Sequence, residues 1–269
     1  MEKNNELKNK IKKEIDKSGH PVSLKASLIL NKKGWYVKNA PIYFDKRTKT
    51  NREIDIVAQK KSNFVKDAFD TLIIECKKQK KNPWVFFKQH KLNKNVFSLN
   101  IDIVETTEGR VYDWLDKKGI FKQHYYYDKP LSTYYFVALS GESEKLNRAI
   151  FNATNQVLDA LRFYISQRLN FFEEYKLRSK APIFFYPIIV VDGKIFEASM
   201  ENSKIDVKES SHISLLVERE LEEPVLIKLF SPEGYSKPIF SKPFLIDIVK
   251  LEYFERFLDN FESQRKEEV

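Results

Sequence analysis

The sequence predicts a mixed α/β fold, with one central β-sheet flanked by helices. Apolar residues recur at spacings of three and four over residues 144–169, which is typical of a long amphipathic helix. Two short runs rich in β-branched residues, 53–58 and 71–77, favour neighbouring strands. Helix, strands, helix and strands follow one another along the chain, an order typical of a mixed α/β sheet.

Local signals set the bounds of the other elements. Gly34 ends the second helix, a polar stretch at 59–70 forms an open loop between two strands, and Asp192-Gly193 predicts a hairpin turn. In chain order, we expect helices at 2–17 and 23–33, strands at 35–37, 53–58 and 71–77, a helix at 144–169, strands at 183–191, 194–199, 213–218, 225–230 and 244–249, and a helix at 252–264.

These elements predict a single domain over residues 1–269, because no repeat or long linker divides the chain. Its core is expected at about 20–192. An aromatic-rich insertion occupies about 83–141 and contains a short helix at 111–118. Residues 193–269 add further strands and the last helix.

Composition indicates the class of protein and its expected cellular location. A content of 42% hydrophobic and 32% charged residues is too apolar for a disordered chain. The longest apolar runs, such as 184–191, are far shorter than the ~20 residues of a bilayer span, so no membrane is expected. Residues 1–17 are polar and lysine-rich, unlike a secretory signal, and Cys76 is the single cysteine. We therefore expect a cytoplasmic protein.

The net charge and the spacing of the glycines indicate which kinds of ligand to expect. A net charge of +9 favours a polyanionic partner, although lysine-rich surfaces are often merely solvated. The 7 glycines are scattered, and neither GxxxxGK[ST] nor GxGxxG occurs. No nucleotide cofactor is expected.

The sharpest feature is a set of charges in the two adjacent apolar strands. Asp55 interrupts the first strand, and Glu75 and Lys77 end the second. Residues two apart share one face of a strand, so Glu75 and Lys77 project together while Cys76 points to the opposite, core face. Such charges are costly to bury without a purpose.

Together these groups suit one chemistry. Two carboxylates, with the backbone carbonyl of Cys76, form an all-oxygen site of the kind that Mg²⁺ or Mn²⁺ prefers. A neighbouring lysine can hold the attacking water or stabilise charge on a phosphate. Metal-assisted hydrolysis of a phosphodiester uses all three side chains. The alternative is a β-hairpin in which Asp55 and Lys77 form a structural ion pair.

Asp55 followed by Glu75-Cys76-Lys77 resembles the PD-(D/E)xK motif of the restriction-endonuclease-like nuclease superfamily. The segment 34–37 (Gly-Trp-Tyr-Val) resembles the element that precedes the site in Mrr-type and Holliday-resolvase-like members. The resemblance implies a restriction-endonuclease-like core in which Asp55 and Glu75 are metal ligands and Lys77 is the catalytic base. It also implies an accessory role for Gln156 on the long helix.

Two positions depart from the superfamily pattern. Ile54 replaces the proline of the motif, a common relaxation, and the helix at 23–33 contains no acidic residue. Glu14 or Asp16 in the preceding helix, or Glu53 beside the motif, would then have to supply a third carboxylate.

A basic run follows the motif directly. Lys78, Lys80 and Lys81, with Trp84 beyond them, are expected to contact phosphates and stack on bases. The alternative is a solvated loop that leads into an apolar strand. The four histidines are isolated and show no metal-binding spacing.

Two functions follow from the resemblance. The first is a Mg²⁺- or Mn²⁺-dependent DNA endonuclease that acts in restriction, repair or defence against foreign DNA, with RNA as another substrate of the same chemistry. A homodimer or a partner subunit would supply a second cut or the specificity. The second is a catalytically inactive subunit that keeps the nuclease fold and binds nucleic acid or assembles with other proteins.

Overall fold

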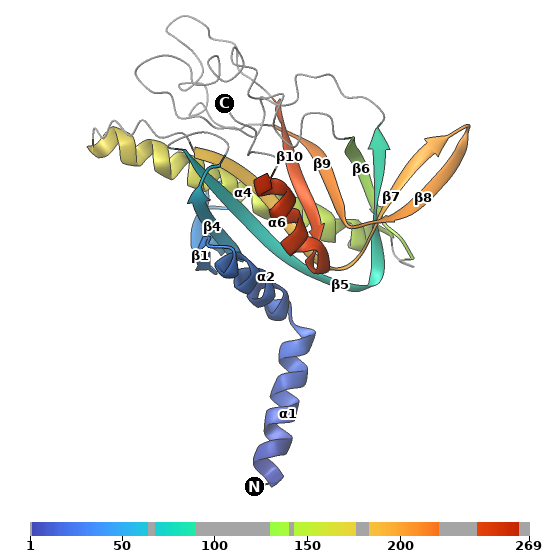
Figure 1. Cartoon of the computed structure of the whole chain (residues 1–269), viewed down its shortest axis with the longest axis horizontal. Coiled ribbons are helices and arrows are strands. Elements are labelled where there is room, and N and C mark those ends of the chain that lie inside the picture. The colour runs from blue at the N-terminus through green and yellow to red at the C-terminus, as the bar shows by residue number, and fades with distance from the viewer. Residues whose placement is uncertain are drawn as a thin grey trace, which may run out of the picture.

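The computed structural model confirms a mixed α/β fold in which a large mixed sheet is flanked by helices (Figure 1). The structure describes residues 2–63, 68–89, 130–139, 143–175, 183–220 and 241–263. Within these ranges, no helix is both long enough and apolar enough to cross a membrane.

The helices are α1 (Glu2–Lys17), α2 (His20–Lys32), α4 (Ser143–Tyr175), the short 3₁₀ helix η3 (Leu251–Tyr253) and α6 (Phe254–Ser263). The strands are β1 (Tyr36–Asn39), β2 (Ile42–Asp45), β3 (Thr50–Glu53), β4 (Ile56–Lys61), β5 (Phe69–Gln89), β6 (Leu131–Val137), β7 (Ile183–Glu201), β8 (Lys204–Ser210), β9 (His212–Glu220) and β10 (Ser241–Lys250).

The main sheet is built around two long parallel strands. Its order is β1-β4-β5-β6-β9-β10-β7-β8, and β5 also pairs with β7, so that β5, β6, β9, β10 and β7 form a closed ring. The β5–β7 ladder runs from Phe69 opposite Ile183 to Phe87 opposite Ala198. β2 and β3 form a separate two-stranded hairpin.

Two hydrophobic clusters cover the two faces of this sheet. α4 packs on one face, where Leu158 and Leu161 meet Ile73 of β5. α2 and α6 pack on the other face, where Phe261 joins a cluster that includes Ile74 of the same strand. Because side chains alternate along a strand, neighbouring residues of β5 belong to opposite clusters.

Local sequence explains the helix bounds. Pro21 lies in the first turn of α2, where its missing N–H costs no hydrogen bond, and Gly34 follows the helix with a φ of +77°. In α6, Phe254, Phe257, Leu258 and Phe261 recur at helical spacing and are all buried.

The hairpin expected at Asp192-Gly193 is wrong. β7 continues straight through this dipeptide, and a Cβ on Gly193 would lie 2.1 Å from the Gln79 carbonyl oxygen. The glycine therefore marks a close approach of two strands rather than a turn. The chain turns later, at Asn202 and Ser203, where φ values of 49° and 62° lead into the unpredicted strand β8.

The strands of the motif also differ from the expected bounds. The run 53–58 is not one strand, because the chain bends at Asp55 between β3 and β4. The second strand does not end at Lys77, since β5 is 21 residues long and contains the whole basic run. The ends of the expected insertion belong to β5 and β6, whereas the helix at 111–118 and the strand at 225–230 lie outside the described residues.

Candidate functional site

The site forms where β4 and β5 separate. Ile56 opposite Ile74 is the last pair of their antiparallel ladder in this direction. Beyond it the chain bends, and Oδ2 of Asp55 accepts a hydrogen bond of 2.7 Å from the backbone N–H of Cys76. Beyond the end of β4, the Asp55 carboxylate is therefore the hydrogen-bond partner of β5. It lies beside the backbone of the Glu75-Cys76-Lys77 segment.

Glu75 and Lys77 point together from the face of the sheet that α4 covers, the face of Ile73. Lys77 Nζ donates a hydrogen bond to Oε1 of Glu75. The side chain of Glu75 is 3% exposed and that of Lys77 is 30% exposed. Oε2 of Glu75 is buried, and the part of the chain that the structure describes offers it no hydrogen-bond partner.

Burial dominates the ionisation of Glu75. Loss of solvent raises the pKa of its carboxyl to about 7, because the lowering effect of the Lys77 charge is smaller and the Asp55 and Glu53 carboxylates oppose it. Cys76 is buried among the side chains under α2 and α6, which raises the pKa of its thiol. The thiol therefore stays neutral, and Cys76 contributes to the site through its backbone.

The backbone of Cys76 faces the Asp55 carboxylate. Within an extended strand, the N–H and C=O of one residue point to the same edge. The Cys76 carbonyl is thus directed to the edge at which its N–H meets Asp55. The Asp55 carboxylate and the Cys76 carbonyl therefore face the same opening between β4 and β5, and the charge of Asp55 contributes to the raised pKa of the neighbouring Glu75.

Tyr43 of β2 is a site residue that the sequence analysis missed. Its side chain is fully buried, and its hydroxyl donates a weak hydrogen bond of 3.4 Å to the Gln156 carbonyl. Burial, followed by the charge of Asp159, raises the pKa of Tyr43 to about 12, and Glu75 adds to the shift. Tyr43 thus contacts α4 and is near enough to Glu75 for that charge to act on it, a long-range placement that no local pattern signals.

The β2–β3 hairpin is fastened to α4 beside the site. Arg47 Nη2 lies 3.4 Å from Asp159 Oδ2, and Gln156 Nε2 donates a 3.0 Å hydrogen bond to the Glu53 carbonyl. Gln156 therefore positions the backbone just before Asp55.

A buried carboxylate shapes the tip of this hairpin. Asp45 accepts hydrogen bonds from the Thr48 side chain and from the backbone N–H groups of Arg47 and Thr48. Arg52 Nη1 lies 3.4 Å away. Burial alone would raise the pKa of Asp45, but these hydrogen bonds outweigh it and lower the pKa.

The predicted nucleic-acid contacts are only partly at the surface. Lys81 is exposed, whereas Lys78 donates to the Asp16 carbonyl at the end of α1. Lys80 belongs to β5, and its side chain lies outside the described set. Trp84 is 1% exposed and packs in the cluster under α4, so the expectation that it stacks on bases is corrected.

The candidate accessory acids do not join the two carboxylates. Glu14 pairs with Lys17 at 2.7 Å on the exposed surface of α1, which projects from the body of the protein (Figure 1). The Glu53 side chain is exposed, although its charge contributes to the raised pKa of Glu75. Among the residues placed by the structure, no group of three or more His, Cys, Asp and Glu side chains is arranged to hold a metal ion.

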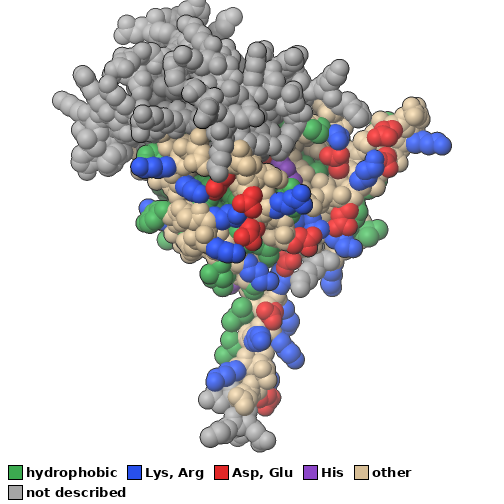
Figure 2. Space-filling view, in the orientation of Figure 1, with side chains coloured by type: hydrophobic (Ala, Val, Ile, Leu, Met, Phe, Trp, Pro, Cys, Tyr) green, Lys and Arg blue, Asp and Glu red, His purple; other side chains and the backbone are tan. Residues whose placement is uncertain are grey.

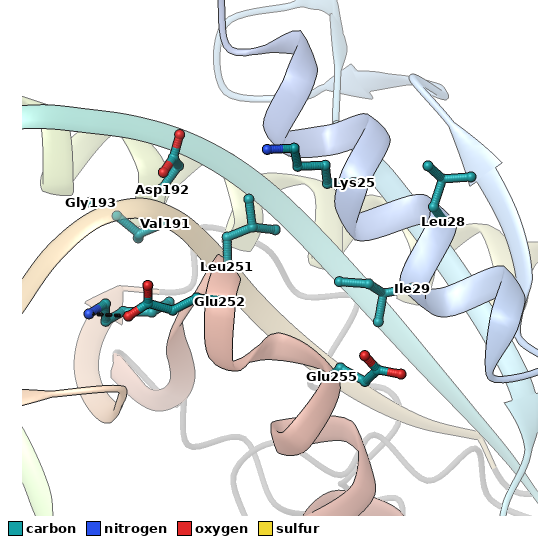
Figure 3. Close-up of a pocket in the computed structure, with 10 residues that line it drawn as sticks. Lys25, Leu28, Ile29, Val191, Asp192, Gly193, Leu251, Glu252 and Glu255 are labelled. Carbon is teal, nitrogen blue, oxygen red and sulfur yellow. Dashed lines mark ion pairs between the residues drawn. The ribbon is translucent and has the colours of Figure 1, made fainter.

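A separate cavity of about 550 Å³ opens between α2, β7 and η3 (Figure 3). Ile29 of α2 extends toward Leu251 across it (Figure 3), Leu28 also lines it, and Lys250 of its lining is ion-paired with Glu252. The cavity lies on the α2 face of the sheet, opposite the face from which Glu75 projects. Figure 2 shows that basic and acidic side chains are interspersed on the visible surface of the body.

Comparison with protein-family models, with curated proteins and with solved structures finds no match to this chain.

Proposed function

We propose that the protein is a metal-dependent nuclease with a restriction-endonuclease-like core, and that Asp55, Glu75 and Lys77 are its catalytic residues. One observation carries the proposal: the opening between β4 and β5 sets the Asp55 carboxylate against the backbone between Glu75 and Lys77. This contact joins two segments that are 21 residues apart in the sequence, which supports reading them as parts of one motif.

The donor set suits a hard divalent cation. Asp55, Glu75 and the Cys76 carbonyl would hold Mg²⁺ or Mn²⁺, with water completing the shell as Mg²⁺ usually requires. The buried, unpartnered Oε2 of Glu75 supports this assignment, because a metal ion would satisfy it. When bound, such an ion polarises the phosphate and activates a water molecule.

Lys77 would act on the substrate side of the site. Its side chain is partly exposed, while the hydrogen bond to Glu75 fixes the position of its ammonium group. From there it would orient the attacking water or stabilise the negative charge of the phosphate.

We propose DNA as the substrate, cut in the course of restriction, repair or defence against foreign DNA. The net charge of +9 and exposed lysines such as Lys81 support a polyanionic ligand. RNA presents the same phosphodiester, so both nucleic acids belong in the test.

The test is metal-dependent nicking of supercoiled DNA, with single-stranded DNA and RNA as parallel substrates. We expect Asp55→Asn, Glu75→Gln and Lys77→Ala each to lower the rate by at least ~100-fold. Lys61→Ala, which removes an exposed lysine from β4, is the matched control and should retain the rate. Equal rates in the wild type and all three site variants would contradict the proposal.

A second candidate is a nuclease-fold subunit that binds nucleic acid without cutting it. It is favoured by the absence of a cluster of three ligating side chains in the described ranges and by the hydrogen bond that already occupies one oxygen of Glu75. Calorimetric titration with Mn²⁺ separates the two candidates. No metal binding, with DNA affinity intact, would support the inactive subunit.

A further inference from the structure

The β7–β8 hairpin presents an open sheet edge. β8 stands last in the strand order and, among the strands that the structure describes, pairs with β7 alone. The hairpin projects from the body of the molecule (Figure 1). Its outer edge therefore offers the backbone N–H and C=O groups of alternate residues along a seven-residue strand, unpaired by any strand that the structure describes.

One face of this hairpin is apolar and uncovered. Met200, Ile205 and Val207 are 59%, 66% and 52% exposed. They share a face, because Met200 is the register partner of Ile205 and Val207 lies two residues along the same strand. Exposed apolar residues on a free strand edge favour association through that edge.

The charges of β8 are complementary to those of a second β8. When two copies run antiparallel with Val207 opposite Val207, Asp206 of each copy faces Lys208 of the other. Ile205 then faces Glu209, and Lys204 faces Ser210. Each chain already holds Lys208 Nζ 2.6 Å from Asp206 Oδ2, so the two strands would form a ring of alternating charges.

Other arrangements lack this match. A parallel pairing would set Asp206 against Asp206 and Lys208 against Lys208, and like charges directly opposite each other are unfavourable. A slip of one residue would bring Val207 opposite a charged neighbour.

We propose that a second copy of this chain adds its β8 to this edge, antiparallel and centred on Val207, to form a symmetric dimer with a sheet continuous across both copies. Backbone hydrogen bonds supply the attachment, and the Asp206–Lys208 pairs fix direction and register. A contact confined to one short strand is small, so we expect a dissociation constant of ~1–100 μM.

Cysteine cross-linking reads the register directly. Val207→Cys places two thiols across the axis, at the Cα separation that a disulfide requires, whereas Ile205→Cys leaves them about 13 Å apart along the strands. The single native cysteine, Cys76, is buried. With oxidised glutathione as the electron acceptor, V207C should form covalent dimers at least ten times faster than I205C; equal rates would overturn the proposal.

Charge reversal provides an independent test that needs no cross-link. Asp206→Lys and Lys208→Asp should each weaken self-association at least tenfold in sedimentation velocity. Mixing the two variants should restore it, because the first then has lysine at both positions, the second has aspartate at both, and opposite charges face each other again. Neither variant keeps the pair within its own chain, so restoration can arise only between chains. A wild type that stays monomeric to about 500 μM, or a mixture that stays monomeric, would overturn the proposal.

Discussion

The Glu75 carboxyl is deeply buried and lies beside the Lys77 ammonium group, and these two features have opposite effects on its pKa. Its pKa in the folded protein, about 7, exceeds the ordinary value of 4.5, so the fold favours the protonated form. The native state therefore binds more protons than the unfolded chain between these values. The contribution of Glu75 to stability falls as the pH rises through this window and stays low above pH 7.

Replacing Glu75 with glutamine should therefore stabilise the protein, but only where the native carboxyl is ionised. The shift from 4.5 to about 7 corresponds to an upper bound of about 3 kcal/mol at pH 8. At pH 4.5 the difference between the variant and the wild type should nearly vanish. Urea unfolding at the two pH values measures both quantities, with the exposed Glu6→Gln as control. A gain that is independent of pH would contradict the assigned cause.

Gly193 is required by a close approach of two strands. Alanine there would place its Cβ 2.1 Å from the Gln79 oxygen, so β5 and β7 must move apart. We expect Gly193→Ala to lower the free energy of unfolding by about 2–3 kcal/mol. Gly19→Ala is the matched control, because its Cβ would meet nothing within 4 Å. Equal effects at the two glycines would rule out the steric explanation.

At the scale of single residues, the sequence singles out charged groups that the structure places in contact with one another, but it does not predict what surrounds them. Asp55, Glu75 and Lys77 stand out because charges within apolar strands are rare. Tyr43 gives no such signal, because its place near Glu75 depends on a hairpin and a helix that are far apart in sequence. Trp84 misleads for a related reason, since an aromatic residue beside lysines fits a binding surface and a core equally well.

Elements are predicted well where apolar residues recur at a regular spacing. They are predicted poorly where a strand has few apolar residues or contains residues typical of a turn. The stripe of α4 and the β-branched cores of β4 and β5 are periodic and are found. Strand β8 is missed because its residues are mostly charged and exposed, and its apolar alternation is limited to Ile205 and Val207, too short a pattern to distinguish a strand from a loop. The Asp192-Gly193 dipeptide has the composition of a turn but forms part of strand β7. Its glycine is explained by the close approach of β5, which leaves no room for a Cβ.

The β2–β3 hairpin depends on its attachment to α4, which a single residue tests. Asp159→Asn removes the charge that Arg47 meets at 3.4 Å and should loosen the hairpin at residues 46–52. We expect faster trypsin cleavage within this basic segment, while the midpoint of global unfolding falls by only a few degrees. Glu6→Gln, an exposed change on α1, is the control and should leave the cleavage rate unchanged.

Faster cleavage in Asp159→Asn should be accompanied by a lower nicking rate if the hairpin positions Asp55 through the bond from Gln156 to Glu53. Unchanged cleavage within 46–52 would show that the attachment to α4 does not depend on this charge.

On the scale of the whole molecule, the two hydrophobic clusters cannot be separated, because they share strands. Leu72 and Ile74 of β5 face α2 and α6, while Ile73 between them faces α4. If β5 or β7 left one cluster, the side chains of the other cluster would be exposed to solvent as well. We therefore expect the described body to unfold in one cooperative transition, with a calorimetric enthalpy equal to the van't Hoff enthalpy.

One substitution on each face tests this coupling. Leu158→Ala under α4 and Phe261→Ala in α6 each remove a fully buried side chain, and each should cost about 3–5 kcal/mol. Because the strands are common to both clusters, both variants should shift the same single transition to lower temperature by comparable amounts. Leu28→Ala, at an exposed position of α2, should leave it in place. If Phe261→Ala instead produced an early transition that Leu158→Ala lacked, α2 and α6 would be a separate unit resting on the sheet rather than one half of its core.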